Sequence, residues 1–196
     1  MTQAIIIVSG LPRSGTSMMM SMLEAGGIPL ITDRIRQADE DNPKGYYEFE
    51  RVKQIDQDAS WLQDAQGKAV KVISALLPKL PPTCTYKIIF MHREMQEILD
   101  SQRQMLLHRG EPVDKVDDRE LAKIFEKHLK HIRQWIARQP NMDMLEVNYN
   151  AVLKAPLQHA YQIAAFLACP MNIDRMVQVV DRSLYRQRHQ LADSQG

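Results

Sequence analysis

The residues best suited to chemistry lie in one short segment near the N-terminus, GLPRSGTS at positions 10–17. Gly10 and Gly15 are separated by four residues, a spacing that nearly matches the GxxxxGK[ST] loop with which many proteins hold phosphate groups. Thr16 stands where that loop has its lysine. The segment instead carries one cation and three hydroxyl groups, at Arg13, Ser14, Thr16 and Ser17. Groups of this kind suit an anionic ligand such as phosphate or sulfate.

The elements on either side of this segment are expected to aim it at an anion. Residues 4–8 form an apolar, mostly β-branched run, which predicts a strand buried on both faces in a parallel sheet. A helix is predicted from Ser14 to the glycine pair Gly26 and Gly27. A loop between strand and helix directs backbone N–H groups at a ligand. We therefore predict an anion-binding loop rather than a turn without a ligand.

A second candidate anion site follows a later strand. Residues 86–91 predict another buried strand, and a helix is expected over residues 95–107. Arg93 lies between the two, at the carboxyl end of the strand, where open α/β sheets bind their ligands. Ser101 follows eight residues later, on the second turn of the helix. The pair can therefore supply a guanidinium and a hydroxyl group to one ligand.

Together these motifs resemble the sulfotransferases that use 3′-phosphoadenosine 5′-phosphosulfate (PAPS) as donor. Residues 12–17 match the family pattern Pro-Lys/Arg-Ser-Gly-Thr-Thr/Ser, and Arg93 with Ser101 matches its strand-Arg-x7-Ser pattern. The resemblance implies that Arg93 and Ser101 grip the 3′-phosphate of PAPS, and that Arg186 and Arg188 close over it. It also implies that the 5′-phosphosulfate is held by Arg13, Ser14, Gly15, Thr16 and Ser17.

The resemblance further implies in-line transfer of a sulfuryl group to a hydroxyl or amine acceptor, with no metal ion. Relatives carry a lysine in the strand that corresponds to residues 68–74, and here that lysine is Lys71. Lys71, Arg13 and the loop amides would stabilise the charge that develops on the leaving phosphate. The alternative for Lys71 is a surface lysine whose stem packs on its apolar neighbours.

The acceptor-activating base is expected to be a carboxylate. Many cytosolic members have Lys-Thr-His in this strand, whereas Ile73 occupies the histidine position here. In the family the base commonly comes from the region after the first helix, which points to Glu48, with Glu50 and Asp33 as competitors. Glu48 stands between two aromatic residues, and rings that exclude water from a carboxylate make it a better base. The alternative is that these rings pack the segment onto the core.

The overall pattern predicts a three-layer α/β fold of the P-loop-like kind, with four to five parallel strands and helices on both faces. Further strands are expected at residues 28–31, 68–74 and 144–149. Further helices are expected at residues 51–62, 119–138 and 173–180, with another that ends near residue 167. At 196 residues, 44% of them hydrophobic and 25% charged, the chain is expected to form one domain, residues 1–196.

Charge and cysteine content restrict the partners and the compartment. The net charge of +1 gives no case for nucleic-acid binding. The two cysteines, Cys84 and Cys169, suit a reducing cytoplasm. No apolar run approaches the roughly 18 residues of a membrane span. We therefore expect a cytoplasmic protein that does not span a membrane, with its acceptor and oligomeric state left open.

Two other functions stay open at this point. One is a P-loop nucleotide or small-molecule kinase, which is disfavoured because Thr16 replaces the lysine. The other is a relative that binds the nucleotide and transfers nothing. A metal site is not expected, since His128 and His131 lie one helical turn apart without a third ligand nearby in the sequence.

Overall fold

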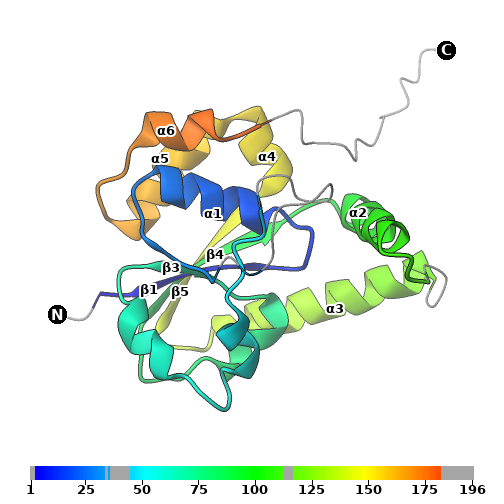
Figure 1. Cartoon of the computed structure of the whole chain (residues 1–196), viewed down its shortest axis with the longest axis horizontal. Coiled ribbons are helices and arrows are strands. Elements are labelled where there is room, and N and C mark those ends of the chain that lie inside the picture. Colours follow the sequence, from blue (N-terminus) through cyan, green and yellow to red (C-terminus); the bar gives the residue numbers. More distant parts are fainter. Residues whose placement is uncertain (1–2, 34, 36–44, 113–116, 182–196) are drawn as a thin grey trace.

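The computed structural model describes residues 3–33, 35, 45–112 and 117–181, which form a five-stranded sheet between two layers of helices (Figure 1). The strands are β1 (Ile5–Gly10), β2 (Leu30–Ile31), β3 (Ala69–Lys71), β4 (Tyr86–His92) and β5 (Met142–Asn148). Their order across the sheet is β2-β3-β1-β4-β5, and all neighbouring strands are parallel. The predicted three-layer α/β fold with parallel strands is therefore confirmed.

Strand β1 lies at the centre of this sheet. All six of its residues are buried, and it pairs with β3 along one edge and with β4 along the other. A run of β-branched residues suits this place, because both faces of the strand are covered by helices. The chain leaves β1 at Gly10 and enters the loop at residues 11–15 directly.

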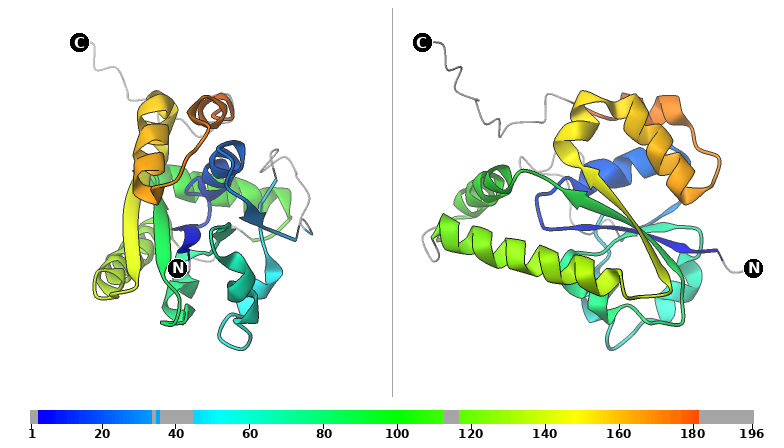
Figure 2. Two further views of the ribbon diagram at one scale, coloured as in Figure 1. Left: turned by 90° about the vertical axis from the view of Figure 1, so that its left-hand side faces the viewer. Right: turned by 180° about the vertical axis from the view of Figure 1, so that it is seen from behind.

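The helices form two layers, and the view from behind in Figure 2 shows them on opposite sides of the sheet. The first layer shares a core with one face and consists of α1 (Thr16–Ala25), α4 (Tyr149–Lys154), α5 (Pro156–Leu167) and α6 (Ile173–Gln178). The other face is covered by α3 (Asp118–Ile136) and the 3-10 helices η1 (Glu50–Gln54), η2 (Ser60–Ala65) and η3 (Ser74–Lys79). Helix α2 (Met95–His108) follows β4 and contacts α3.

The strand order changes direction at β1, and this determines where a ligand can bind. The chain runs from β1 to β2 and β3 on one side, then crosses to β4 and β5 on the other. Open α/β sheets bind ligands outside the carboxyl ends of the strands at such a point. Along this edge Val8 is in register with Lys71, and Gly10 with Met91. The segments that follow β1, β3, β4 and β5 therefore all start at the same edge.

The single helix predicted over residues 51–62 is wrong, because η1 and η2 form there as separate 3-10 helices. Between them the Asp58 carboxylate accepts a hydrogen bond from the backbone N–H of Ser60 at 3.0 Å. Arg51 donates to Asp58 at 2.7 Å and to the Ser60 hydroxyl at 3.0 Å. Short polar side chains that bond to nearby backbone compete with helix formation. A local turn thus interrupts what the sequence pattern predicts as one helix.

Two further properties concern the described residues as a set. None of the helices among them is both long enough and apolar enough to cross a membrane. In the same residues, no three His, Cys, Asp or Glu side chains are grouped as a metal ion would require. Of the histidine pair on α3, His128 lies with Nε2 2.9 Å from the Ser74 hydroxyl and so connects α3 to η3.

Candidate active site

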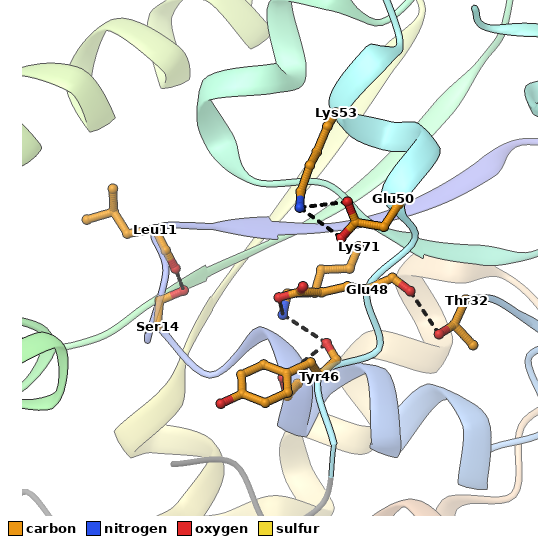
Figure 3. Close-up of polar contacts among 9 residues, drawn as sticks. Leu11, Ser14, Thr32, Tyr46, Glu48, Glu50, Lys53 and Lys71 are labelled. Carbon is orange, nitrogen blue, oxygen red and sulfur yellow. Dashed lines mark hydrogen bonds and ion pairs between the residues drawn. The ribbon is translucent and has the colours of Figure 1, made fainter. Parts of the chain in front are cut away.

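The loop after β1 is shaped by its own hydrogen bonds. Ser14 is buried, and its hydroxyl donates to the carbonyl oxygen of Leu11 at 2.7 Å (Figure 3). The backbone N–H of Ser14 donates to the same oxygen at 3.3 Å. Arg13, between them, has a φ of 70°, in the left-handed region that residues with a side chain rarely adopt. The Ser14 side chain thus maintains a tight turn that ends where helix α1 begins.

Helix α1 starts without negative charge in its own first turn. Its N-cap is Gly15, which has no side chain, and its first turn contains no acidic residue. In contrast, helix α3 is capped by the side chain of Asp117 and has Asp118 and Glu120 in its first turn. The first N–H groups of a helix carry the positive end of its dipole, which an acidic side chain would offset. The start of α1 therefore keeps its partial positive charge, which favours the binding of an anion.

Arg93 is held at the carboxyl end of β4 by contacts with Glu97, Arg13 and Tyr149. Its Nε donates to the Glu97 carboxylate at 2.7 Å, and its Nη1 donates to the backbone carbonyl of Arg13 at 3.4 Å. The guanidinium carbon lies 4.5 Å from the centre of the Tyr149 ring. The side chains of Arg93 and Glu97 are only 8% and 2% exposed. This guanidinium is therefore fixed inside the protein.

Arg13 joins the loop to the Arg93 and Ser101 pair. Its Nε donates to the hydroxyl of Ser101 at 2.8 Å, across 88 residues of sequence. Ser101 is buried on helix α2. The sequence predicts the loop and the pair as separate anion sites, and the fold brings them into direct contact. We call Arg13, Arg93, Glu97, Ser101 and Tyr149 the arginine cluster.

Lys71 lies on the other side of β1 and approaches Glu48 (Figure 3). Its Nζ donates to the carbonyl of Tyr46 at 2.9 Å and is 3.9 Å from a Glu48 carboxylate oxygen. The two side chains are 13% and 29% exposed, so Lys71 does not extend into solvent as a surface lysine would. The hydroxyl of Ser17, in the first turn of α1, makes a long hydrogen bond of 3.5 Å to the same carbonyl. Lys71 and Glu48 are thus connected to the start of α1.

The two carboxylates predicted as competitors of Glu48 have different neighbours. Asp33 accepts hydrogen bonds from the backbone N–H of Glu50 at 2.6 Å and of Ile35 at 3.0 Å. The Glu50 carboxylate pairs with Lys53 at 2.8 Å (Figure 3). Among the contacts of the described residues, Glu48 is the carboxylate of these three that meets Lys71.

The aromatic rings beside Glu48 pack elsewhere. The Phe49 ring meets the Trp61 ring edge-on, with ring centres 5.2 Å apart. The Tyr47 hydroxyl donates to Glu24 on helix α1 at 3.3 Å. These rings attach their segment to the core and to α1, as the packing alternative predicts. The charged neighbour observed for Glu48 is Lys71.

The comparison with protein families decides which family this architecture represents. The family described as the sulfotransferase domain matches residues 3–194. The chain belongs to the sulfotransferase family. Its general activity is therefore that of a transferase for sulfuryl groups, and the predicted resemblance to the sulfotransferases is confirmed.

Solved sulfotransferase structures share the fold. A sulfotransferase domain from the curacin biosynthetic pathway is 18% identical with a TM-score of 0.52, over 91% of this chain and 78% of that chain. The mouse sulfotransferase SULT7A1, complexed with PAP, is 18% identical with a TM-score of 0.54, over 92% of this chain and 63% of that chain. Sulfotransferase STF1 from Mycobacterium tuberculosis is 12% identical with a TM-score of 0.54, over 92% of this chain and 71% of that chain. No curated protein matches the sequence.

Two members of the arginine cluster, Glu97 and Tyr149, are not identified by the sequence motifs. A weak signal exists for Glu97, which follows Arg93 by four residues, a spacing at which charged side chains on a helix can pair. Tyr149 and its neighbour Asn150 start helix α4, and they reach the cluster only through the packing of that helix. Arg186 and Arg188 lie outside the described residues, so their expected role stays a prediction.

Gly15 offers a test of how closely Tyr149 packs on the loop. Gly15 has a φ of 96°, and a Cβ there would overlap the Tyr149 ring, whereas Gly27 has a φ of 99° with nothing within 4 Å of a Cβ. Alanine at either position carries about 1–2 kcal/mol of left-handed strain. We expect Gly15→Ala to reduce the free energy of unfolding in urea by at least about 1 kcal/mol more than Gly27→Ala. Equal losses would contradict the packing of Tyr149 against the loop.

Proposed function

We propose that this sulfotransferase domain moves a sulfuryl group from PAPS to a hydroxyl or amine acceptor. The observation that carries the proposal is the 2.8 Å hydrogen bond from Arg13 to Ser101, because it joins the anion-binding loop to the pair expected at a 3′-phosphate. A donor with anionic groups at both its 5′ and 3′ positions requires two such sites close together. The PAP bound in the mouse SULT7A1 structure supports a donor of the same class.

The donor would be held mainly by hydrogen bonds from charged or oriented groups. The backbone N–H groups at the start of α1, with the hydroxyls of Thr16 and Ser17, suit the 5′-phosphosulfate. Arg13 is expected at the 5′-phosphosulfate as well, whereas Arg93 and Ser101 suit the 3′-phosphate, since bonds between a guanidinium and a phosphate are short and strong. Arg186 is proposed as a further cation at this end of the donor.

The transfer step would use the groups on the β3 side of the loop. Glu48 would take the proton of the acceptor as the acceptor oxygen or nitrogen bonds to sulfur. The bond from sulfur to the bridging oxygen breaks at the same time, and its electron pair stays on the 5′-phosphate. Lys71, Arg13 and the loop amides would stabilise that added charge. The 3.9 Å separation of Lys71 and Glu48 supports a common reaction centre for the two residues.

We also propose that the chain acts as one domain in a reducing cytoplasm, because Cys84 and Cys169 are both free thiols.

The alternative functions can be tested directly. A kinase would bind ATP with Mg²⁺ in preference to adenosine 3′,5′-bisphosphate (PAP), and isothermal titration calorimetry with both ligands distinguishes the two. A relative that only binds the donor would show no turnover of sulfur-labelled PAPS over a panel of alcohols, phenols and amines.

Arg93→Ala tests the 3′-phosphate site. We expect its dissociation constant for PAP to rise about 10- to 100-fold, because charge-assisted bonds to the 3′-phosphate are lost. Affinity for adenosine 5′-phosphate, which lacks that group, should change less than about threefold. Arg103→Ala is the control, since Arg103 lies on the surface of α2 in an ion pair with Asp118. Calorimetry that shows equal losses for both ligands would remove Arg93 from the 3′ site.

Lys71→Met tests whether the lysine acts on the transition state. The variant keeps an unbranched side chain and removes the charge, so turnover should fall about 100-fold or more while PAP affinity changes little. Lys53→Met removes a charge that pairs with Glu50 and should leave turnover near the wild-type value. Turnover is measured as the release of PAP from PAPS with an acceptor found in the panel. A Lys71→Met variant as active as the wild type would contradict the proposed role.

Glu48→Gln tests the base. We expect turnover to fall at least about 100-fold with PAP affinity unchanged, because the amide cannot accept the acceptor proton. Glu50→Gln is the matched control, and Glu50 replaces Glu48 as the candidate base if that variant is the one that loses activity.

A double variant separates a base from a counter-ion of Lys71. If Glu48 acts only by orienting Lys71, then Glu48→Gln should cause no further loss in a Lys71→Met background. A base should lower turnover again in that background. The product of the two single losses is therefore the expected result for the double variant.

A further inference from the structure

The arginine cluster contains a buried acidic residue that the proposed function does not use. Glu97 is on helix α2, and its side chain is 2% exposed. Its carboxylate accepts the 2.7 Å hydrogen bond from Nε of Arg93. At first sight this is unfavourable for a phosphate site, because the carboxylate repels an anion and offsets the charge of the arginine. Glu97 must contribute something that compensates for this repulsion.

Asn150 holds Glu97 from the other side. Its Nδ2 lies 3.1 Å from each oxygen of the Glu97 carboxylate. Asn150 belongs to helix α4. Asn148 caps the start of this helix, because its side chain accepts a hydrogen bond from the backbone N–H of Ala151 at 2.8 Å. Among the described residues, the carboxylate thus accepts hydrogen bonds from Arg93 at the end of β4 and from Asn150 on α4. Its orientation is set by both.

The Arg93 guanidinium is in turn held by several neighbours. Glu97 accepts a hydrogen bond from its Nε at 2.7 Å, and the carbonyl of Arg13 accepts one from its Nη1 at 3.4 Å. The Tyr149 ring supports the face of the group, with the guanidinium carbon 4.5 Å from the ring centre. A long, flexible side chain that is ordered before its ligand arrives loses less conformational entropy on binding. Arg13, also in the cluster, supplies a second positive charge, so the cluster keeps a net charge of +1 despite Glu97.

We propose that Glu97 is a positioning residue: held by Asn150, it fixes the Arg93 guanidinium for the 3′-phosphate of the donor. This inference rests on the proposed function and identifies the contact that prepares one of its binding sites. It also predicts a change in phosphate affinity opposite to the one expected from charge repulsion alone. If Glu97 only offsets the charge of Arg93, its neutralisation strengthens phosphate binding. If Glu97 positions Arg93, its neutralisation weakens it.

The test measures the 3′ increment, defined as the ratio of the dissociation constants for adenosine 5′-phosphate and for PAP. Glu97→Gln keeps the shape of the side chain but replaces the charged acceptor of Arg93 with a neutral amide oxygen, and it adds an NH₂ group that needs an acceptor on the Asn150 side. We expect the dissociation constant for PAP to rise about tenfold in calorimetry, with that for adenosine 5′-phosphate changed less than twofold. Glu94→Gln, which removes an exposed charge just before the same helix, should leave the 3′ increment unchanged.

A charge relocation provides the rescue. In Glu97→Gln/Asn150→Asp, the amide oxygen at position 97 can accept from Arg93 while its NH₂ donates to the carboxylate at position 150. The net charge is that of the wild type, and both hydrogen bonds are restored, so we expect the 3′ increment to return to within about threefold of the wild-type value. A role in stability alone would not give this recovery of ligand discrimination.

Other outcomes have defined meanings. A Glu97→Gln variant that binds PAP as tightly as the wild type, or more tightly, overturns the inference. If that variant does not fold by circular dichroism, Asn150→Ala takes its place, because it removes the Nδ2 donor and leaves the carboxylate; an unchanged 3′ increment then overturns the inference. A wild-type protein without preference for PAP over adenosine 5′-phosphate would instead refute the proposed donor, so the two failures are distinguishable.

Discussion

The pairing of β1 with β3 along one edge and with β4 along the other is the constraint on which the rest of the structure depends. Parallel strands all end at one edge of the sheet, so the segments that follow them meet there even when they are far apart in sequence. Arg13 and Ser101 are 88 residues apart and form a hydrogen bond. The buried strand β1 therefore sets the place from which the loop leaves, between Lys71 on one side and Arg93 on the other.

The two sides of this loop differ in how their charges are held. On the β4 side, Arg93 and Glu97 are almost fully buried and bonded at 2.7 Å, and separation of such a pair would leave an uncompensated charge in the interior. On the β3 side, the side chains of Lys71 and Glu48 are 13% and 29% exposed, and their charged groups are 3.9 Å apart, farther than a hydrogen bond. A binding site benefits from fixed groups, whereas groups that move a proton or follow a shifting charge must respond. This contrast supports donor binding on the first side and transfer on the second.

What the sequence predicted depends on how local each feature is. The loop at residues 10–17 and the Arg93 and Ser101 pair belong to strand–turn–helix units, whose geometry follows from neighbouring residues. The contact of Glu97 with Asn150 was not predictable, because it requires helices α2 and α4 to meet. The prediction of a continuous helix at residues 51–62 failed for the opposite reason, since local hydrogen bonds among Arg51, Asp58 and Ser60 form a turn within it. The hydrophobic periodicity of a sequence predicts neither the contacts between elements nor the local hydrogen bonds that interrupt an element.

The segment around Glu48 shows how an aromatic pattern can serve a site indirectly. The rings of Tyr47 and Phe49 are directed to helix α1 and to Trp61, and the Tyr46 side chain is buried. These anchors tie residues 46–49 to the end of α1 and to η2, while the Tyr46 carbonyl accepts hydrogen bonds from Ser17 in the first turn of α1 and from Lys71 at 2.9 Å. The same anchoring sets the distance from Glu48 to Lys71. The aromatic residues therefore act on the site through the backbone that they position, so a carboxylate beside such rings is best judged by the charged group that its segment approaches.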